Sequence, residues 1–276
     1  MRAWACSFHH ELHGQKLDLS TISKIFAKTV DNGLCHSLQW TYRESGINDM
    51  RLQTMKVLIA CEESQAVCKA FRAKGHESYS CDIRDCSGGH PEWHIKQDVI
   101  PLLNGRCRFI TCDGTLHIIP DRWDLIIAHP PCTRLCNSGQ RWLYYGNEEY
   151  RSKKIKEQEN AIKFFMCFVN ADCERIAIEN PNGIMSSLYR KADCYYNPYD
   201  FEGETECKKT CLWLKGLPPL RPTRIIPLPK EYRTQGIWKG QFDGKSYSWS
   251  SSECSRLRSV TPKGVAKAMA DQWGTI

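Results

Sequence analysis

The chain has 276 residues, a net charge of +7 and 41% apolar residues, which suits one large domain or one domain with an appendage. No run approaches the ~18 consecutive apolar residues of a membrane span. The first residues lack the apolar core of a secretory leader, because His9, His10 and Glu11 interrupt it. We therefore expect a cytoplasmic protein with no membrane partner.

The sixteen cysteines do not form the CxxC tetrads that are typical of zinc sites. A disulfide scaffold is also unexpected in a chain of this length without a leader. We expect mostly reduced thiols in the core and no bound metal. A metal site formed by Cys6, His9 and His13 is the less favoured alternative.

Positive charge is concentrated near the end of the chain. Residues 205–263 contain twelve Lys or Arg against four Asp or Glu, a surplus of +8. Six aromatic residues are interleaved with them: Trp213, Tyr232, Trp238, Phe242, Tyr247 and Trp249. Such a mixture fits a polyanion with exposed bases, and a solvated basic face stays open as the alternative.

The first 54 residues show no clear strand pattern, and we expect a dispensable N-terminal extension with one amphipathic helix over 19–30. Strands then alternate with helices. The pattern predicts strands at 57–60, 78–83, 107–111, 123–128, 175–178 and 211–214, and helices at 64–74, 151–170 and from Pro262 onward. In the helix over 151–170, the expected inner side carries Ile155, Ile162, Phe165, Met166 and Val169. This alternation predicts an α/β fold with a doubly wound, mostly parallel sheet.

Two strand ends carry reactive side chains. The apolar run 123–128 is stopped by Pro130 and Pro131, which cannot donate to a sheet ladder, and Cys132 follows at once. The run Ile176–Ile178 ends in the same way at Glu179. Ligands of open α/β sheets bind at the carboxyl ends of strands, so a thiol and a carboxylate there indicate covalent chemistry on an electrophilic ring.

Each of these residues also has an ordinary structural interpretation. Cys132 could be a buried thiol after a strand, with Cys136 as a nearby rival, and Glu179 could be a capping or hydrogen-bonded carboxylate.

The dipeptides Pro131-Cys132 and Glu179-Asn180, in this order, resemble the signature of cytosine-5 DNA methyltransferases, of the short divergent kind found in phages and their bacterial hosts. The resemblance spans roughly residues 55–273. It implies a Rossmann-like fold that transfers a methyl group from S-adenosylmethionine to carbon 5 of cytosine in double-stranded DNA. The target base leaves the stack, the Cys132 thiolate adds to carbon 6, and Glu179 holds or protonates the adjacent ring nitrogen.

The resemblance also implies a division of the chain: an N-terminal extension (1–54), a catalytic and cofactor-binding domain (55–216), a small target-recognition region (217–255) and a closing C-terminal helix (256–276). The implied catalytic residues are Cys132, Glu179, Asn180 and Lys209. The implied cofactor-binding residues are Cys61, Glu62, Glu63, Ser64, Asp82, Asp98 and Pro130. The implied DNA-binding residues are Arg134, Gln140, Arg141, Lys208, Arg256 and Arg258.

Within this assignment, Arg134 is expected to lower the pKa of the Cys132 thiol, and residues 140–145, between Gly139 and Gly146, are expected to close over the flipped base. The chain departs from the family in two places. The turn after its first strand, 60–65, contains no glycine, and Lys208-Lys209 stands where the family has an arginine cluster.

Two other functions remain open. One is a catalytically silent DNA-binding protein on a methyltransferase scaffold, which the glycine-free turn favours. The other is an enzyme that modifies a free pyrimidine nucleotide, which the basic C-terminal third disfavours. An amine-methylating enzyme is disfavoured because such enzymes have an aromatic residue, not a cysteine, after the Pro-Pro pair.

Overall fold

The computed structural model describes residues 54–137, 141–233 and 251–275, together with short pieces at 11–12, 15–16, 241–242, 245–246 and 248. Contacts divide the chain into two units, Met1–Arg51 and Leu52–Ile276. In the first unit, β1 (Glu11–Leu12) pairs antiparallel with β2 (Gln15–Lys16). The helix expected over 19–30 and the alternative metal site near the N-terminus lie outside the described residues.

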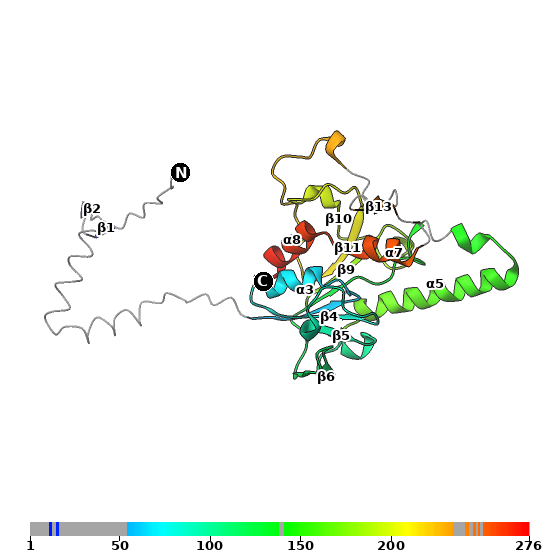
Figure 1. Ribbon diagram of the computed structural model, residues 1–276, viewed down its shortest axis with the longest axis horizontal. Coiled ribbons are helices and arrows are strands. Elements are labelled where there is room, and N and C mark those ends of the chain that lie inside the picture. Colours follow the sequence, from blue (N-terminus) through cyan, green and yellow to red (C-terminus); the bar gives the residue numbers. More distant parts are fainter. Residues whose placement is uncertain are drawn as a thin grey trace. The chain divides into compact units, whose positions relative to one another are not determined.

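The second unit is built on a seven-stranded sheet, counted over the residues that the structure describes, with the order β10-β11-β9-β8-β3-β4-β5. The strands are β3 (Lys56–Ala60), β4 (Glu77–Asp82), β5 (His94–Lys96), β8 (Leu125–Ala128), β9 (Ile176–Pro181), β10 (Cys194–Tyr196) and β11 (Thr210–Lys215). The five strands from β5 to β9 are parallel and follow the 3-2-1-4-5 order of Rossmann-like folds. β11 runs antiparallel to both of its neighbours, β9 and the edge strand β10. The prediction of a doubly wound, mostly parallel sheet is therefore confirmed (Figure 1).

Apolar side chains on both faces of the sheet form two cores. In β3, Val57 and Ile59 belong to one core, whereas Leu58 and Ala60 belong to the other, as the two-residue period of a strand requires. The first core packs against α3 (Ala66–Arg72) and α8 (Lys263–Trp273), which contact each other. The second packs against α5 (Glu148–Val169) (Figure 1).

The helix α5 is longer than its contact with the sheet. Phe165 and Phe168, near its end, are fully buried, while Ile155 is 48% exposed. Figure 1 shows the first half of the helix extending beyond the sheet, so the prediction that Ile155 faces the core is wrong. The helix begins at Glu148 because the side chain of Asn147 accepts from the Tyr150 N–H and caps the first turn.

Short elements were missed where the sequence offers too few residues for a pattern. These are β5, β10, α6 (Met185–Leu188) and α7 (Ser252–Ser259). The expected strand over 107–111 is one arm of a hairpin, β6 (Cys107–Ile110) with β7 (Leu116–Ile119). Pro262 precedes α8 as its cap and is not its first helical residue, so that prediction is wrong by one position.

Within the described part of the chain, no helix is both long enough and apolar enough to cross a lipid bilayer. None of the cysteines described there is joined in a disulfide.

Candidate functional site

The candidate site lies at the carboxyl ends of the central strands. The chain continues from β3 toward β5 on one side and from β8 toward β9 on the other, so the strand order reverses between β3 and β8. Such a reversal opens a crevice in which ligands of open α/β sheets bind. Cys61 follows β3, His129 follows β8 and Glu179 lies near the end of β9.

His129 and Glu179 form a buried ion pair at this crevice. The parallel register pairs Ala128 with Ile178, so the next residue of each strand faces the other. The distance from His129 Nδ1 to Glu179 Oε2 is 2.7 Å, and the two side chains are 11% and 13% exposed. Sequence reasoning missed His129, although it directly precedes the Pro-Pro pair.

Each partner of this pair shifts the pKa of the other. Burial is the largest effect and would lower the pKa of His129, but the charge and hydrogen bond of Glu179 together with the charge of Glu62 outweigh it, and the pKa lies above its usual value. Burial is the largest effect and would raise the pKa of Glu179, but the charge and hydrogen bond of His129, the charge of Lys208 and the hydrogen bond of Tyr196 together outweigh it, and the pKa lies below its usual value. The histidine is therefore held protonated and the carboxylate ionised.

Three further polar groups surround the pair. Tyr196, at the end of β10, is hydrogen-bonded to the Glu179 carboxylate, and burial raises the pKa of its hydroxyl. The charge of Lys208 acts on His129, Glu179 and the Cys132 thiol. The carboxylate of Glu62 attracts the His129 ring from the β3 side.

Asn180 joins the two reactive strand ends. Its Nδ2 donates to the carbonyl oxygen of Pro130 over 2.8 Å. This bond fixes the Pro-Pro segment after β8 against the end of β9, so Cys132 and Glu179 are held in one region. Asn180 Oδ1 is buried and has no hydrogen-bond partner among the described residues.

Cys132 is an exposed residue at the start of a single helical turn, in which the Cys136 N–H donates to its carbonyl oxygen. The hydrogen bond with the Cys136 thiol raises the pKa of Cys132 far above its usual range, and partial withdrawal of the sulfur from water raises it further. The charge of Lys208 acts in the opposite direction. Cys132 is consequently a thiol, not a thiolate, in this arrangement.

Arg134 does not activate this thiol. Its guanidinium Nη2 lies 2.7 Å from Glu157 Oε2 of α5, and the same carboxylate also binds Lys154. The expectation that Arg134 lowers the pKa of Cys132 is therefore wrong, because a carboxylate on the long helix already neutralises its charge.

Hydrogen bonds from side chains stabilise the glycine-free turn after β3. Glu62 accepts hydrogen bonds from the Val67 and Cys68 N–H groups and so caps α3. Cys61 and Gln65 both adopt left-handed backbone conformations, with φ near 60°, which cost a non-glycine residue roughly 1 kcal/mol. These are the two positions at which a glycine would relieve the turn.

Gln65 compensates for its strained backbone with its amide group. Its Oε1 accepts from the His90 N–H at 3.0 Å and from the Cys86 thiol, and its Nε2 donates to the His90 carbonyl at 2.9 Å. Gly88 lies so close that a Cβ there would come within 2.5 Å of the Gln65 side chain. The amide thus attaches the turn to the loop after β4.

We expect Gln65→Ala to destabilise the protein by about 3 kcal/mol, because buried hydrogen bonds are lost and the left-handed strain stays. Gln65→Gly should cost about 1 kcal/mol less than Gln65→Ala, because glycine tolerates this backbone. Urea unfolding of both variants measures the two differences. Equal losses would show that the turn is not strained at Gln65.

Two predicted cofactor residues lie at the carboxyl edge of the sheet: Asp82 ends β4, and Asp98 follows β5. Burial raises the pKa of Cys61 well above its usual value, and the charges of Asp82, Cys81 and Asp98 raise it further. Asp82 and Asp98 therefore both lie near Cys61. Their carboxylates also accept from nearby N–H groups, Asp82 from Arg84 and Asp98 from Ile100. Carboxylates at this edge suit the hydroxyl groups of a ribose.

The other residues predicted to bind the cofactor lie in or beside the turn after β3 or in the Pro-Pro segment after β8. Glu63 is buried, and its Oε1 lies 3.7 Å from Arg256 Nη1 of α7. Arg256 is bound more closely by Glu253. Ser64 is half-buried, and Pro130 is buried beside Asn180.

The structure brings Lys208 to the site but not Lys209. Lys208 Nζ donates to the Arg258 carbonyl at 2.9 Å, whereas Lys209 is exposed and lies 4.9 Å over the Tyr195 ring. The two lysines precede β11 on successive residues, which a strand directs to opposite faces. The placement of Lys209 among the catalytic residues is therefore not supported, whereas the charge of Lys208 acts on His129, Cys132 and Glu179.

The expected closing loop is only partly described. Gly139 and Gln140 lie outside the described residues, and Arg141 begins a 3-10 helix, η3 (Arg141–Tyr144), in which its side chain is not described. Most of the expected recognition region after residue 233 lies outside them too.

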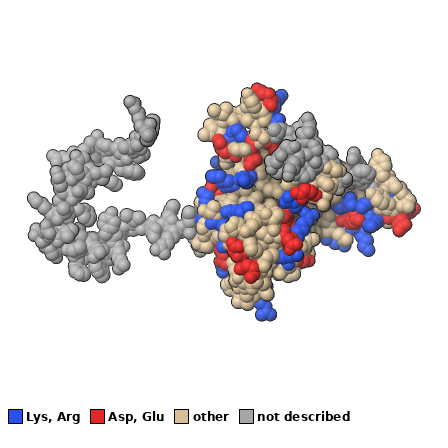
Figure 2. Space-filling view, viewed as in Figure 1, with Lys and Arg blue, Asp and Glu red and all other residues tan. Residues whose placement is uncertain are grey.

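Positive charge is not segregated on the face of the molecule that Figure 2 shows. On the face in Figure 2, Lys and Arg alternate with Asp and Glu, also over α5. Trp213, one of the aromatics interleaved with the basic residues, is 2% exposed and belongs to the core. The described residues also contain no cluster of three His, Cys, Asp or Glu that could hold a metal.

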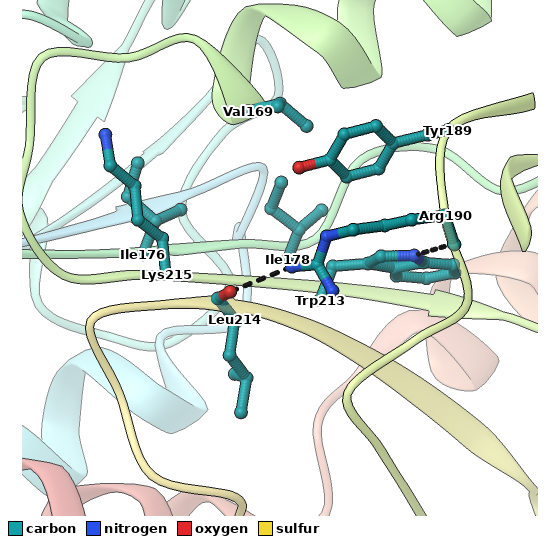
Figure 3. Close-up of a pocket in the computed structure, with 8 residues that line it drawn as sticks. All are labelled: Val169, Ile176, Ile178, Tyr189, Arg190, Trp213, Leu214 and Lys215. Atoms are coloured by element: carbon teal, nitrogen blue, oxygen red, sulfur yellow. Dashed lines mark hydrogen bonds between the residues drawn. The ribbon is translucent and has the colours of Figure 1, made fainter.

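A small pocket of about 230 Å³ lies elsewhere, at the amino end of β9 (Figure 3). Arg190 crosses it and donates to the Leu214 carbonyl at 2.9 Å, and Trp213 donates to the Arg190 carbonyl. None of the site residues predicted from the sequence lines this pocket.

No protein-family model and no curated protein matches the chain. Among solved structures, a similar one is a triple mutant of DNMT2 from Spodoptera frugiperda, at 15% identity and a TM-score of 0.31. The match covers 65% of this chain and 56% of that one, so it spans little more than half of the length of DNMT2. A likeness of this size establishes neither a family nor an activity.

Proposed function

We propose that the protein transfers a methyl group to carbon 5 of cytosine in DNA. The observation that carries this proposal is the bond from Asn180 to Pro130, which holds the segment before Cys132 against the end of β9, where Glu179 lies and its charge acts on the Cys132 thiol. A nucleophile and a carboxyl group at a topological switch point suit a flipped base that is attacked on one edge and held on another.

In this mechanism Cys132, which is exposed, loses its thiol proton to water, and its sulfur forms a bond to carbon 6 of the cytosine ring. The electrons of the C5–C6 double bond move toward carbon 4, and the ring nitrogen N3 gains a proton delivered through the Glu179 carboxylate. Carbon 5 thereby becomes nucleophilic. After methylation, a base takes the carbon-5 proton, and the electrons of that C–H bond form the C5–C6 double bond as the sulfur leaves carbon 6 as a thiolate.

The crevice also has donors and acceptors that fit S-adenosylmethionine. Asp82 would bind ribose hydroxyls and Asp98 would contact the adenine, and the buried Glu63 carboxylate, whose Oε1 lies 3.7 Å from Arg256 Nη1, would accept from an amino group. When bound, S-adenosylmethionine supplies an electrophilic methyl group. The chain itself supplies the nucleophile, the acid and the enclosure of the base.

Bisulfite sequencing of DNA from cells that express the chain tests the proposal. We expect new 5-methylcytosine with the wild type, and none with Cys132→Ser, because a hydroxyl does not add to carbon 6. Cys112→Ser is the matched control, since Cys112 is an exposed cysteine after β6 and should leave methylation unchanged. Absence of new 5-methylcytosine with the wild type would refute the proposal.

A catalytically silent DNA-binding protein is the second candidate. The raised pKa of Cys132 and the glycine-free turn favour it. Calorimetric titration with S-adenosylmethionine separates the two functions, because the silent protein should show no binding at millimolar concentration. Transfer of labelled methyl groups to polymeric DNA alone would exclude the free-nucleotide enzyme.

A further inference from the structure

We propose that His129 is a positioning residue that orients the Glu179 carboxylate and stores the proton which this carboxylate passes to the base. This inference rests on the proposed function and adds to it a residue outside the sequence signature. It concerns the ion pair between His129 Nδ1 and Glu179 Oε2, 2.7 Å apart at the ends of β8 and β9.

The geometry favours proton exchange within the pair. The distance is that of a short charge-assisted hydrogen bond, and both side chains are largely withdrawn from water. The second ring nitrogen, His129 Nε2, is buried and has no hydrogen-bond partner among the described residues. In the protonated ring, the Nε2–H therefore has no acceptor in the described part of the chain, which disfavours the protonated form. The Nδ1–H still donates to Glu179, which favours that form.

The charged groups around the ring determine its protonation. Glu179 and Glu62 attract a proton to the ring, whereas the Lys208 ammonium repels it. Tyr196 is neutral and hydrogen-bonded to Glu179. The balance favours the protonated ring, in agreement with the raised pKa of His129.

The proton that N3 receives comes from the His129–Glu179 pair and later returns to it. As the Cys132 sulfur bonds to carbon 6, negative charge develops at N3 of the base. The Nδ1 proton of His129 passes to the ionised Glu179 carboxylate, which gives it to N3, so the ring ends neutral and the carboxylate ends ionised. When the sulfur leaves carbon 6, the N3 proton returns by the same path. Water is therefore not the source of the N3 proton.

His129→Asn tests this inference, because the asparagine amide can still donate to Glu179 but holds no transferable proton. We expect kcat for DNA methylation to fall by about 100-fold with KM nearly unchanged. The wild-type kcat/KM should decline as pH rises through the raised pKa of His129, since the ring then loses its proton. The variant should lack this decline and continue to rise as the thiolate forms.

Two controls separate the inference from simpler effects. His117→Asn removes another hydrogen-bonded histidine, bound to Tyr79 and away from the crevice, and should preserve both activity and pH profile. Nitrogen NMR of the wild-type chain should show a histidine that titrates above its usual range, assigned as His129 by its loss in His129→Asn and shifted downward in Glu179→Gln. The NMR measurement does not depend on catalysis.

If His129→Asn keeps the wild-type kcat and the alkaline decline, His129 is merely structural and the inference is wrong while the proposed function stands. If the histidine titrates below its usual range in the wild type, the stored proton does not exist. A wild type without methylation would remove the proposed function and the inference with it.

Discussion

Replacing Glu179 with glutamine is expected to lower methylation about 10³-fold, equivalent to about 4 kcal/mol of transition-state stabilisation. The substitution preserves the size of the side chain but removes its charge and its transferable proton. His129 then loses the partner that keeps it protonated, so its pKa should fall below the usual value under the effect of burial. The substitution therefore removes both the proton transfer through residue 179 and the proton stored on His129.

Methylation of a defined duplex with labelled S-adenosylmethionine measures the rate, and NMR of the histidines reports the pKa. Glu159→Gln is the matched control, because Glu159 is an exposed carboxylate of α5. If Glu179→Gln retained more than a tenth of the activity, the carboxylate would not be the acid of the reaction.

Replacing Cys136 with alanine is expected to make Cys132 more reactive. The hydrogen bond with the Cys136 thiol is the largest cause of the raised pKa of Cys132. Its removal should increase the thiolate fraction about tenfold for each unit by which the pKa falls. We therefore expect alkylation of Cys132 by iodoacetamide at pH 8 to be at least ten times faster.

Peptide mass spectrometry follows the alkylation at Cys132 separately from the other thiols. Lys208→Met should have the opposite effect, because the Lys208 ammonium lowers the pKa of this thiol. Cys112→Ala, after β6, is the control and should leave the rate unchanged. An unchanged rate in Cys136→Ala would show that Cys136 does not hold Cys132 in the protonated state.

The sequence was sufficient to predict the parallel strands and the ends at which Cys132 and Glu179 lie. Their apolar runs are long enough to be recognised, and the prolines mark where pairing stops. His129 could not be found in this way, because its role depends on the register between β8 and β9. The register between β8 and β9 depends on how the two strands pack in the sheet. No short sequence pattern predicts it, because the strands are far apart in the chain.

Similar reasons explain the other differences. Lys208 and Lys209 are chemically alike, and only the direction of the chain entering β11 decides which one reaches the crevice. Ile155 fits the helical period of α5, but the period does not show where the sheet beneath the helix ends. The sequence shows that the turn after β3 lacks glycine, but it does not show how the left-handed residues are stabilised. The stabilising bonds join Gln65 to His90, in a loop further along the chain.

The packing of α8 against α3 has a consequence for biosynthesis. The apolar face of α3, with Val67 and Phe71, is covered by Val265, Met269 and Trp273, almost two hundred residues further on. While the ribosome is still translating, this face has no cover and is open to chaperones or to other nascent chains. The domain closes only after its last helix has emerged, so a premature stop before residue 263 should leave a product prone to aggregation.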